Sequence, residues 1–295
     1  MYPMEVKHMS FVVFADGSSN LPGSMLEGVT LLPCTYTVDD AVYTYLGDVD
    51  AFNGKAYYNQ LREGKVIKTS LLNTQLFLDH FRPVLERGED ALYVAMSSGI
   101  SGTYQAARIA AEELTEEFPD RTVRIIDSHG CGFGSGLLVY HGAQLSRQGL
   151  SAKEAADILD EEVPHMCQYF TVDDLNFLKR TGRVSGATAM IGSVLNIKPL
   201  LYGTTDGHIV SCAKCRGRKK AIEALVEKYV EKAVDPENQI VCISHGDCPE
   251  DAQVLAEKVR AAAAPKQIVI CQHEPFSGAH VGPGMLALFF YGKER

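Results

Sequence analysis

Four polar segments of this 295-residue sequence hold the side chains that could do chemistry. The most informative is Ser97-Ser-Gly-Ile-Ser-Gly-Thr103, which follows the apolar run 91–96 and opens a helical stretch. Its hydroxyls and the free backbone N–H groups of a helix N-terminus form a set of donors suited to a carboxylate or phosphate. Helix capping explains one serine but not three serines with two glycines, so we favour anion binding at this turn.

Two familiar catalytic or nucleotide-binding motifs are narrowly missed. A nucleophile elbow would need glycine where Thr103 stands, and the lysine of a phosphate-binding loop is absent from the same turn. The turn Asp127–Gly136 contains four glycines but no G-x-G-x-x-G spacing. Close packing of a helix on a sheet explains these glycines as well as a nucleotide does. A nucleotide-binding sugar or ketone kinase is therefore a weak alternative.

The remaining polar segments each allow two interpretations. The turn Asp16–Pro22 offers hydroxyls to a ligand, or an Asx turn with a helix cap. Basic residues gather at 179–185, at Lys198 and at 214–220, where they could neutralise an anion, dock an acidic partner or form a solvated surface. Between them, the apolar stretch 187–196 suits either the lining of a tunnel or a core helix.

Composition limits the classes of function. With 28 basic and 37 acidic residues the net charge is −9, which disfavours general nucleic-acid binding. No apolar run reaches the roughly 18 residues of a membrane span. The N-terminal residues lack the basic and then apolar order of a secretory signal. We therefore expect a cytoplasmic protein. Cys212 and Cys215 lack the second pair of ligands that a structural zinc site needs, and we interpret the eight cysteines mainly as small buried side chains.

Apolar runs alternate with helical stretches, which predicts an α/β fold of two domains. We expect a mostly parallel sheet in residues 1–165 and a mixed sheet in 166–295, with the ligand in the cleft between them and the final strand able to return to the first domain. The expected strands are 11–15, 29–37, 91–96, 123–127, 167–172, 197–202, 208–213, 239–244, 267–271 and 285–291. The expected helices are 74–87, 103–118, 134–147, 152–163, 219–232 and 250–263.

Taken together and in order, these turns resemble the DegV family of fatty-acid-binding proteins along nearly the whole chain. The motifs that carry the resemblance are Asp16–Pro22, Thr69-Ser70, Ser98–Tyr104, Ile126–Ser128, Asp174–Ser185, Leu195–Leu201, Lys214–Ala221 and His280–Gly284. The resemblance implies a non-catalytic carrier with no cofactor and no metal. Such a carrier buries a long-chain fatty acid and presents it to a separate ATP-dependent fatty acid kinase that makes an acyl phosphate. It further implies a monomer with, at most, transient membrane contact.

The resemblance also assigns roles to residues. Thr69 and Ser101 match the family's carboxylate-binding positions, and Arg183, His280, Ser98 and Gly102 fall near the head group. Two hydroxyls can satisfy a buried carboxylate without adding a fixed positive charge. The sequence departs from the family at Gly17, after Thr69-Ser70, and at His129 and Cys131. The alternative from another class is a serine-dependent acyl hydrolase or transferase that uses Ser101 as nucleophile and His280 as base.

Overall fold

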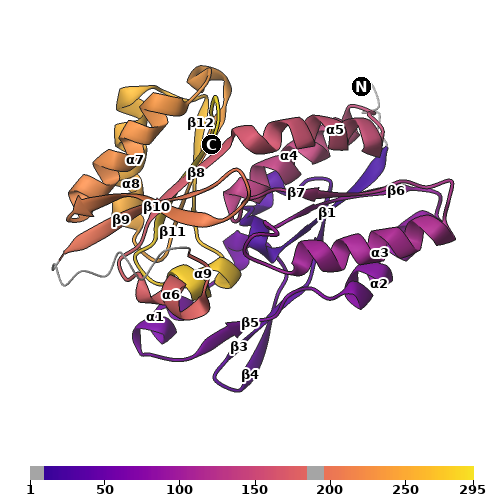
Figure 1. The fold of residues 1–295 in the computed structure, drawn as a ribbon, viewed down its shortest axis with the longest axis horizontal. Coiled ribbons are helices and arrows are strands. Elements are labelled where there is room, and N and C mark those ends of the chain that lie inside the picture. The colour runs from indigo at the N-terminus through magenta and orange to yellow at the C-terminus, as the bar shows by residue number, and fades with distance from the viewer. Residues whose placement is uncertain (1–9, 185–195) are drawn as a thin grey trace, which may run out of the picture.

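The first half of the chain forms a parallel sheet, as predicted. The computed structural model describes residues 10–184 and 196–295. Within them, four parallel strands lie in the order β2-β1-β6-β7, with bounds β1 Phe11–Asp16, β2 Val29–Leu32, β6 Asp90–Ala95 and β7 Val123–Asp127. Helices cover both faces, α4 (Phe133–Arg147) and α5 (Ala152–Glu162) on one, α2 (Thr74–Glu86) and α3 (Thr103–Glu117) on the other (Figure 1). Neighbouring residues of strand β1 therefore belong to different hydrophobic clusters. Val13 lies in the cluster with α4, and Phe14 lies in the cluster with α2.

The second half forms a mixed sheet of six strands in the order β10-β9-β8-β13-β11-β12. Their bounds are β8 Met166–Thr171, β9 Ile197–Gly203, β10 Ile209–Arg216, β11 Ile240–His245, β12 Gln267–Gln272 and β13 Leu286–Tyr291. Helices α7 (Arg218–Lys232) and α8 (Pro249–Ala262) pack on one face of this sheet. The other face joins α4 in a core shared with the first sheet, to which Phe170 and Phe289 contribute. The final strand, β13, stays in the second sheet between β8 and β11.

A third, antiparallel sheet was not predicted, and it corrects the single strand expected over 29–37. Pro33 lacks an N–H donor and separates β2 from β3 (Cys34–Val38), which belong to different sheets. Strand β3 pairs with β4 (Ala41–Tyr45) and β5 (Ile67–Thr69), and this sheet projects at the bottom of Figure 1. The short helices α1 (Gly54–Arg62), α6 (Asn176–Thr181) and α9 (Pro275–Val281) were also missed.

Glycines of the segment 127–136 allow helix α4 to approach its neighbours closely. A Cβ atom on Gly136 would lie 2.2 Å from the backbone oxygen of Ser19, and one on Gly134 would lie 2.6 Å from Oε1 of Gln168. No side chain fits at such distances without a shift of the backbone or of a buried amide. The close-packing interpretation of these glycines is therefore confirmed.

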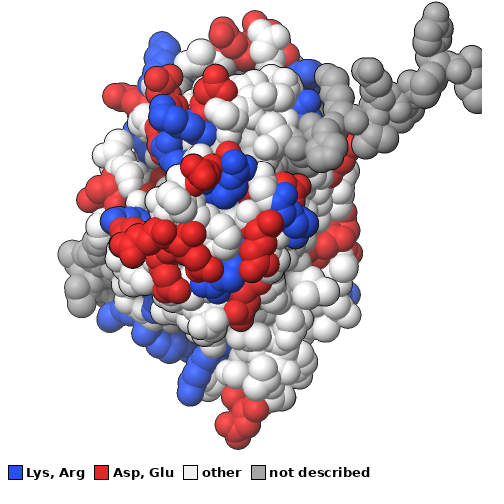
Figure 2. Space-filling model, turned by 90° about the vertical axis from the view of Figure 1, so that its right-hand side faces the viewer, with Lys and Arg blue, Asp and Glu red and all other residues white. Residues whose placement is uncertain are grey.

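The surface on the α2–α3 side of the molecule mixes charges of both signs (Figure 2). Arg82 of α2 binds Glu117 of α3 at 2.8 Å, and Arg108 binds Glu112 along α3 at 2.6 Å. Exposed pairs of this kind contribute little stability each. No helix among the described residues is both long enough and apolar enough to cross a bilayer.

Candidate ligand-binding site

A cavity of about 340 Å³ lies between the two halves of the chain. Its walls come from the ends of β1 and β5 and the start of α3 in the first half, and from α6, β10 and α9 in the second. Five of the six residues expected around the head group line this one cavity: Thr69, Ser101, Gly102, Arg183 and His280. The topology therefore brings together side chains that are separated by more than 200 positions in the sequence.

Thr69 and His280 contact each other in the wall of the cavity. Thr69 ends β5 and His280 lies in the last turn of α9, and Thr69 Oγ1 is 3.1 Å from His280 Nε2. The other ring nitrogen, Nδ1, is buried and has no hydrogen-bond partner. Burial, assisted by the positive charges of Arg183 and Arg180, lowers the pKa of His280 to about 4. The imidazole is therefore neutral at neutral pH, and a carboxylate bound beside it would stabilise its protonated form.

The buried histidine predicts a loss of stability in acid. Its folded-state pKa lies below the value of 6.5 for an unperturbed histidine, so unfolding takes up a proton as the pH falls from 6.5 towards 4. We expect the unliganded protein to lose about 1–3 kcal/mol of unfolding free energy from this group over that window. Urea denaturation at several pH values should show a shallower pH dependence for His280→Gln than for the parent. His208→Gln, at an exposed turn, is the control, and parallel curves for His280→Gln and the parent would contradict the prediction.

Ser101 lies at the start of α3 beside a second hydroxyl that sequence reasoning missed. Its Oγ donates to Oγ1 of Thr103 at 3.0 Å and accepts from the backbone N–H of Thr103 at 3.2 Å. Gly102 is the N-cap residue of α3 and provides no side-chain cap. The N-terminal end of a 15-residue helix thus adds a partial positive charge to this wall of the cavity. Thr103 stands in the same polar turn, which is the signal that could have identified it.

Arg183 brings a positive charge to the exposed side of the cavity. Helix α6 ends at Thr181, and Gly182 with φ of 72° turns the chain so that Arg183 lines the cavity and is also exposed to solvent. Elsewhere in the basic segments, Lys198 binds Asp173 at 2.6 Å and Arg218 binds Asp251 at 2.8 Å. Part of the basic run is therefore committed to ion pairs within the fold.

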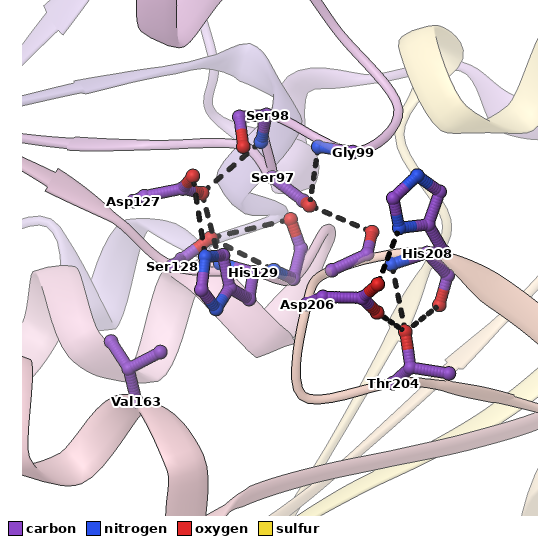
Figure 3. A network of polar contacts seen from close by, with 12 residues as sticks. Ser97, Ser98, Gly99, Asp127, Ser128, His129, Val163, Thr204, Asp206 and His208 are labelled. Carbon is purple, nitrogen blue, oxygen red and sulfur yellow. Dashed lines mark hydrogen bonds and ion pairs between the residues drawn. The ribbon is translucent and has the colours of Figure 1, made fainter.

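Ser98, which we expected beside the head group, does not line this cavity. Its side chain is exposed, and its backbone N–H donates to Asp127 at 3.1 Å (Figure 3). The neighbouring Ser97 has a structural role instead, because its Oγ donates to the carbonyl of Gly207 at 2.7 Å and accepts from the N–H of Gly99 at 3.1 Å. The bond to Gly207 joins the turn 97–99 to the hairpin between β9 and β10.

A smaller, more apolar cavity of about 30 Å³ continues the first one. The two share four lining residues, Ile100, Cys131, Ile209 and Val281. The far part of the smaller cavity is formed largely by apolar side chains of the second sheet and the loop before it, namely Tyr169, Phe170, Met285, Ala287 and Phe289. A site that is polar at one end and apolar at the other suits an amphipathic ligand with a polar head and a long apolar tail.

The geometry of a serine hydrolase is not assembled among the described residues. Ser101 bonds to Thr103, whereas His280 bonds to Thr69. Asp127 accepts from the backbone of Ser98 and pairs with His129 at 3.4 Å, so it does not orient His280. A nucleophile, a base and an orienting acid in mutual contact are the signature that the alternative required.

The cysteine pair shows no metal site. Cys215 is buried but Cys212 is exposed, so the interpretation as a buried side chain was wrong for Cys212. Within the ranges 10–184 and 196–295, no group of three or more His, Cys, Asp or Glu side chains could hold a metal ion. The tunnel-or-helix hypothesis for 187–196, and Ser185 of the basic segment, fall almost entirely on positions outside the described residues.

Comparison with known proteins settles the family. Residues 10–293 match the family model described as "Uncharacterised protein, DegV family". A DegV domain-containing protein of Clostridium perfringens is 40% identical over 288 residues, covering 97% of this chain and 98% of that protein. The chain belongs to the DegV family.

Solved structures of DegV proteins share this fold. A DegV family protein from Thermus thermophilus, described by its fatty acid binding, superposes with a TM-score of 0.85 at 26% identity, covering 96% of this chain and all of that one. A fatty acid binding DegV family protein from Streptococcus agalactiae gives a TM-score of 0.84 at 25% identity, covering 97% of this chain and all of that one. The two-sheet α/β architecture is therefore that of DegV proteins.

Proposed function

We propose that this DegV protein binds a long-chain fatty acid in the two connected cavities, with the carboxylate at Thr69 and Ser101 and the tail in the apolar end. The observation that carries the proposal is the pair of hydroxyls that line one partly enclosed cavity, which adjoins a second and more apolar cavity. A carboxylate with a dry tail needs hydrogen-bond donors at its head, and these hydroxyls supply them. The fatty acid binding of the Thermus and Streptococcus relatives supports the same ligand class.

Calorimetric titration of the delipidated protein tests this proposal. We expect hexadecanoate to bind at a single site, and its methyl ester to bind at least about tenfold more weakly because the ester offers no charge to the hydroxyls. Equal affinity for acid and ester would show that the polar end does not bind a carboxylate. No binding of either would reject the ligand class.

We further propose that the bound acid is presented to a separate ATP-dependent fatty acid kinase, as the resemblance to DegV carriers implied. The exposed side of the cavity beside Arg183 supports this role, because a head group there can be reached from outside. The guanidinium can stabilise the negative charge that develops when a phosphoryl group is transferred to the carboxylate. On this account the chain contributes binding and electrostatics but performs no turnover alone.

Arg183→Ala should separate presentation from binding. We expect its affinity for hexadecanoate to change by less than about threefold, because an exposed guanidinium adds little to a screened contact. Acyl phosphate formation with a bacterial fatty acid kinase and ATP, trapped with hydroxylamine as the hydroxamate, should fall by at least about tenfold. Lys214→Ala, which removes an exposed charge away from the cavity, is the matched control. Equal losses of affinity and product would place Arg183 in ligand binding instead.

A further inference from the structure

The hairpin between β9 and β10 forms part of the wall of the smaller, apolar cavity. Gly203, Gly207 and Ile209 line this cavity from the hairpin, and His129, in the turn after β7, lines it from the first half of the chain. The side chain of His129 is also 32% exposed, so the cavity wall is thin at this residue. At this point the apolar end of the proposed site is closed by two segments that belong to different halves of the chain.

The hairpin packs directly on His129. A Cβ atom on Gly207 would lie 3.3 Å from Cδ2 of the His129 ring and would collide with Oγ of Ser97, which donates to the Gly207 carbonyl (Figure 3). The backbone of His129 has a left-handed φ of 49°, which is uncommon for a residue with a side chain. A strained backbone in a cavity wall suggests that this side chain has a role there.

The imidazole of His129 has an acceptor in each half of the chain. Its Nε2 lies 3.4 Å from Oδ2 of Asp127 at the end of β7, and the backbone carbonyl of Thr205 in the hairpin also hydrogen-bonds to the ring. A protonated imidazole has two N–H donors and can serve both acceptors, whereas a neutral imidazole has one. The ring therefore keeps both contacts only while it is protonated.

The charges next to the ring favour its protonated form. The hydrogen bond to Asp127 raises the pKa of His129 above its usual value, and burial and the positive charge of Arg295 oppose this effect only in part. Although burial raises the pKa of Asp127, hydrogen bonds from His129 and Ser98 hold that pKa below its usual value. The imidazole therefore faces an ionised carboxylate.

The other titratable groups around the ring do not compete with it near neutral pH. Burial lowers the pKa of Arg295 to about 10 and raises the pKa of Cys131 to about 12, so both keep their protons. In the hairpin, Asp206 and His208 pair with each other at 3.2 Å (Figure 3). His208 is thus a second histidine of the same hairpin whose partner lies within the hairpin itself.

We propose that His129 is a positioning residue of the ligand site, whose protonated ring holds the hairpin 204–208 against the first half of the chain and so closes the apolar end. This inference rests on the proposed function, which places the tail of the fatty acid in the smaller cavity. Because the pKa of His129 is raised in the folded chain, the closing contact is present below that pKa and weakens as the pH rises through it. A bound acid is then released faster.

The release of radiolabelled hexadecanoate from the loaded full chain to excess albumin, measured from about pH 6 to about pH 8.5, tests the inference. We expect the release rate of the parent to rise about three- to tenfold over this range, the effect of one partly exposed, charge-assisted hydrogen bond. His129→Asn should release the acid at the fast rate at every pH. Asparagine tolerates the left-handed backbone, but its side chain is shorter and carries no charge.

Two further variants separate the charge of His129 from other titrations. His208→Gln is the matched control and should follow the parent, because its ring pairs with Asp206. Asp127→Asn removes the charge that favours the protonated ring, so the rise in release rate should move to lower pH.

A release rate of the parent that does not change with pH overturns the inference. A rise that persists in His129→Asn, or that is lost in His208→Gln, overturns it as well, as does slow release from His129→Asn at every pH. In each of these cases slow release of hexadecanoate from the parent at about pH 6 leaves the proposed function intact. If the parent binds no hexadecanoate at any pH, the proposed function fails and this inference fails with it.

Discussion

Replacing both Thr69 and Ser101 by alanine is expected to lower the affinity for hexadecanoate by at least about a hundredfold. Each hydroxyl is worth about 1–3 kcal/mol to a buried carboxylate, since its loss leaves part of the charge without a partner. The Thr69 change has a second effect, because it also removes the contact of His280 Nε2 at 3.1 Å. Titration calorimetry of the delipidated single and double variants measures both contributions.

A matched control separates the hydroxyl from the space it fills. Thr69→Ser retains the oxygen and should keep the affinity within about fivefold of the parent, whereas Thr69→Val retains the shape but loses the oxygen and should behave like alanine. The two alanine changes need not add, because both residues contact one charge. An unchanged affinity in the double variant would overturn the assignment of the carboxylate site.

Gly136→Ala is expected to destabilise the fold by at least about 2 kcal/mol, although alanine is the better helix former. The added Cβ would lie 2.2 Å from the backbone oxygen of Ser19, so α4 or the turn after β1 must move. That turn carries Ser18 into the cavity wall, and we expect ligand retention to fall together with stability. Urea denaturation and calorimetric titration of the same preparation measure the two effects.

The same helix offers the control for this prediction. A Cβ on Gly142 would lie 3.3 Å from Cδ1 of Leu159, a side-chain atom that can adjust. Gly142→Ala should therefore be close to neutral, or slightly stabilising through helix propensity. Equal stabilities of the two variants would show that the contact at Gly136 yields more easily than the structure implies.

Much of the fold follows from hydrophobic patterning. The strands of the parallel sheet and the long helices α2, α3, α4, α5, α7 and α8 lie where their periodicity predicted them. The failures are short elements: β4, β5, α1, α6 and α9 have at most nine residues each, too few for a period to stand out. Pro33 was a readable signal that was overlooked, since it ends one strand and begins another in a different sheet.

The sequence motifs predicted most residues of the candidate site. The predictions were wrong where tertiary contacts determine which way a side chain points. Five of the expected head-group residues line the cavity because each lies at or near the end of a strand or helix. Ser98 does not line the cavity, because neighbouring serines of one turn have different hydrogen-bond partners. Hydrophobic periodicity does not show which of these serines faces the cavity.

The central claim is that the chain carries a long-chain fatty acid, and mass spectrometry of the lipid extracted from the purified protein tests it most directly. The account predicts about one molecule of long-chain fatty acid per chain in the organic extract of the parent, and much less from the Thr69→Ala, Ser101→Ala double variant. A folded parent that yields no fatty acid, and that takes none up from added hexadecanoate, would contradict it.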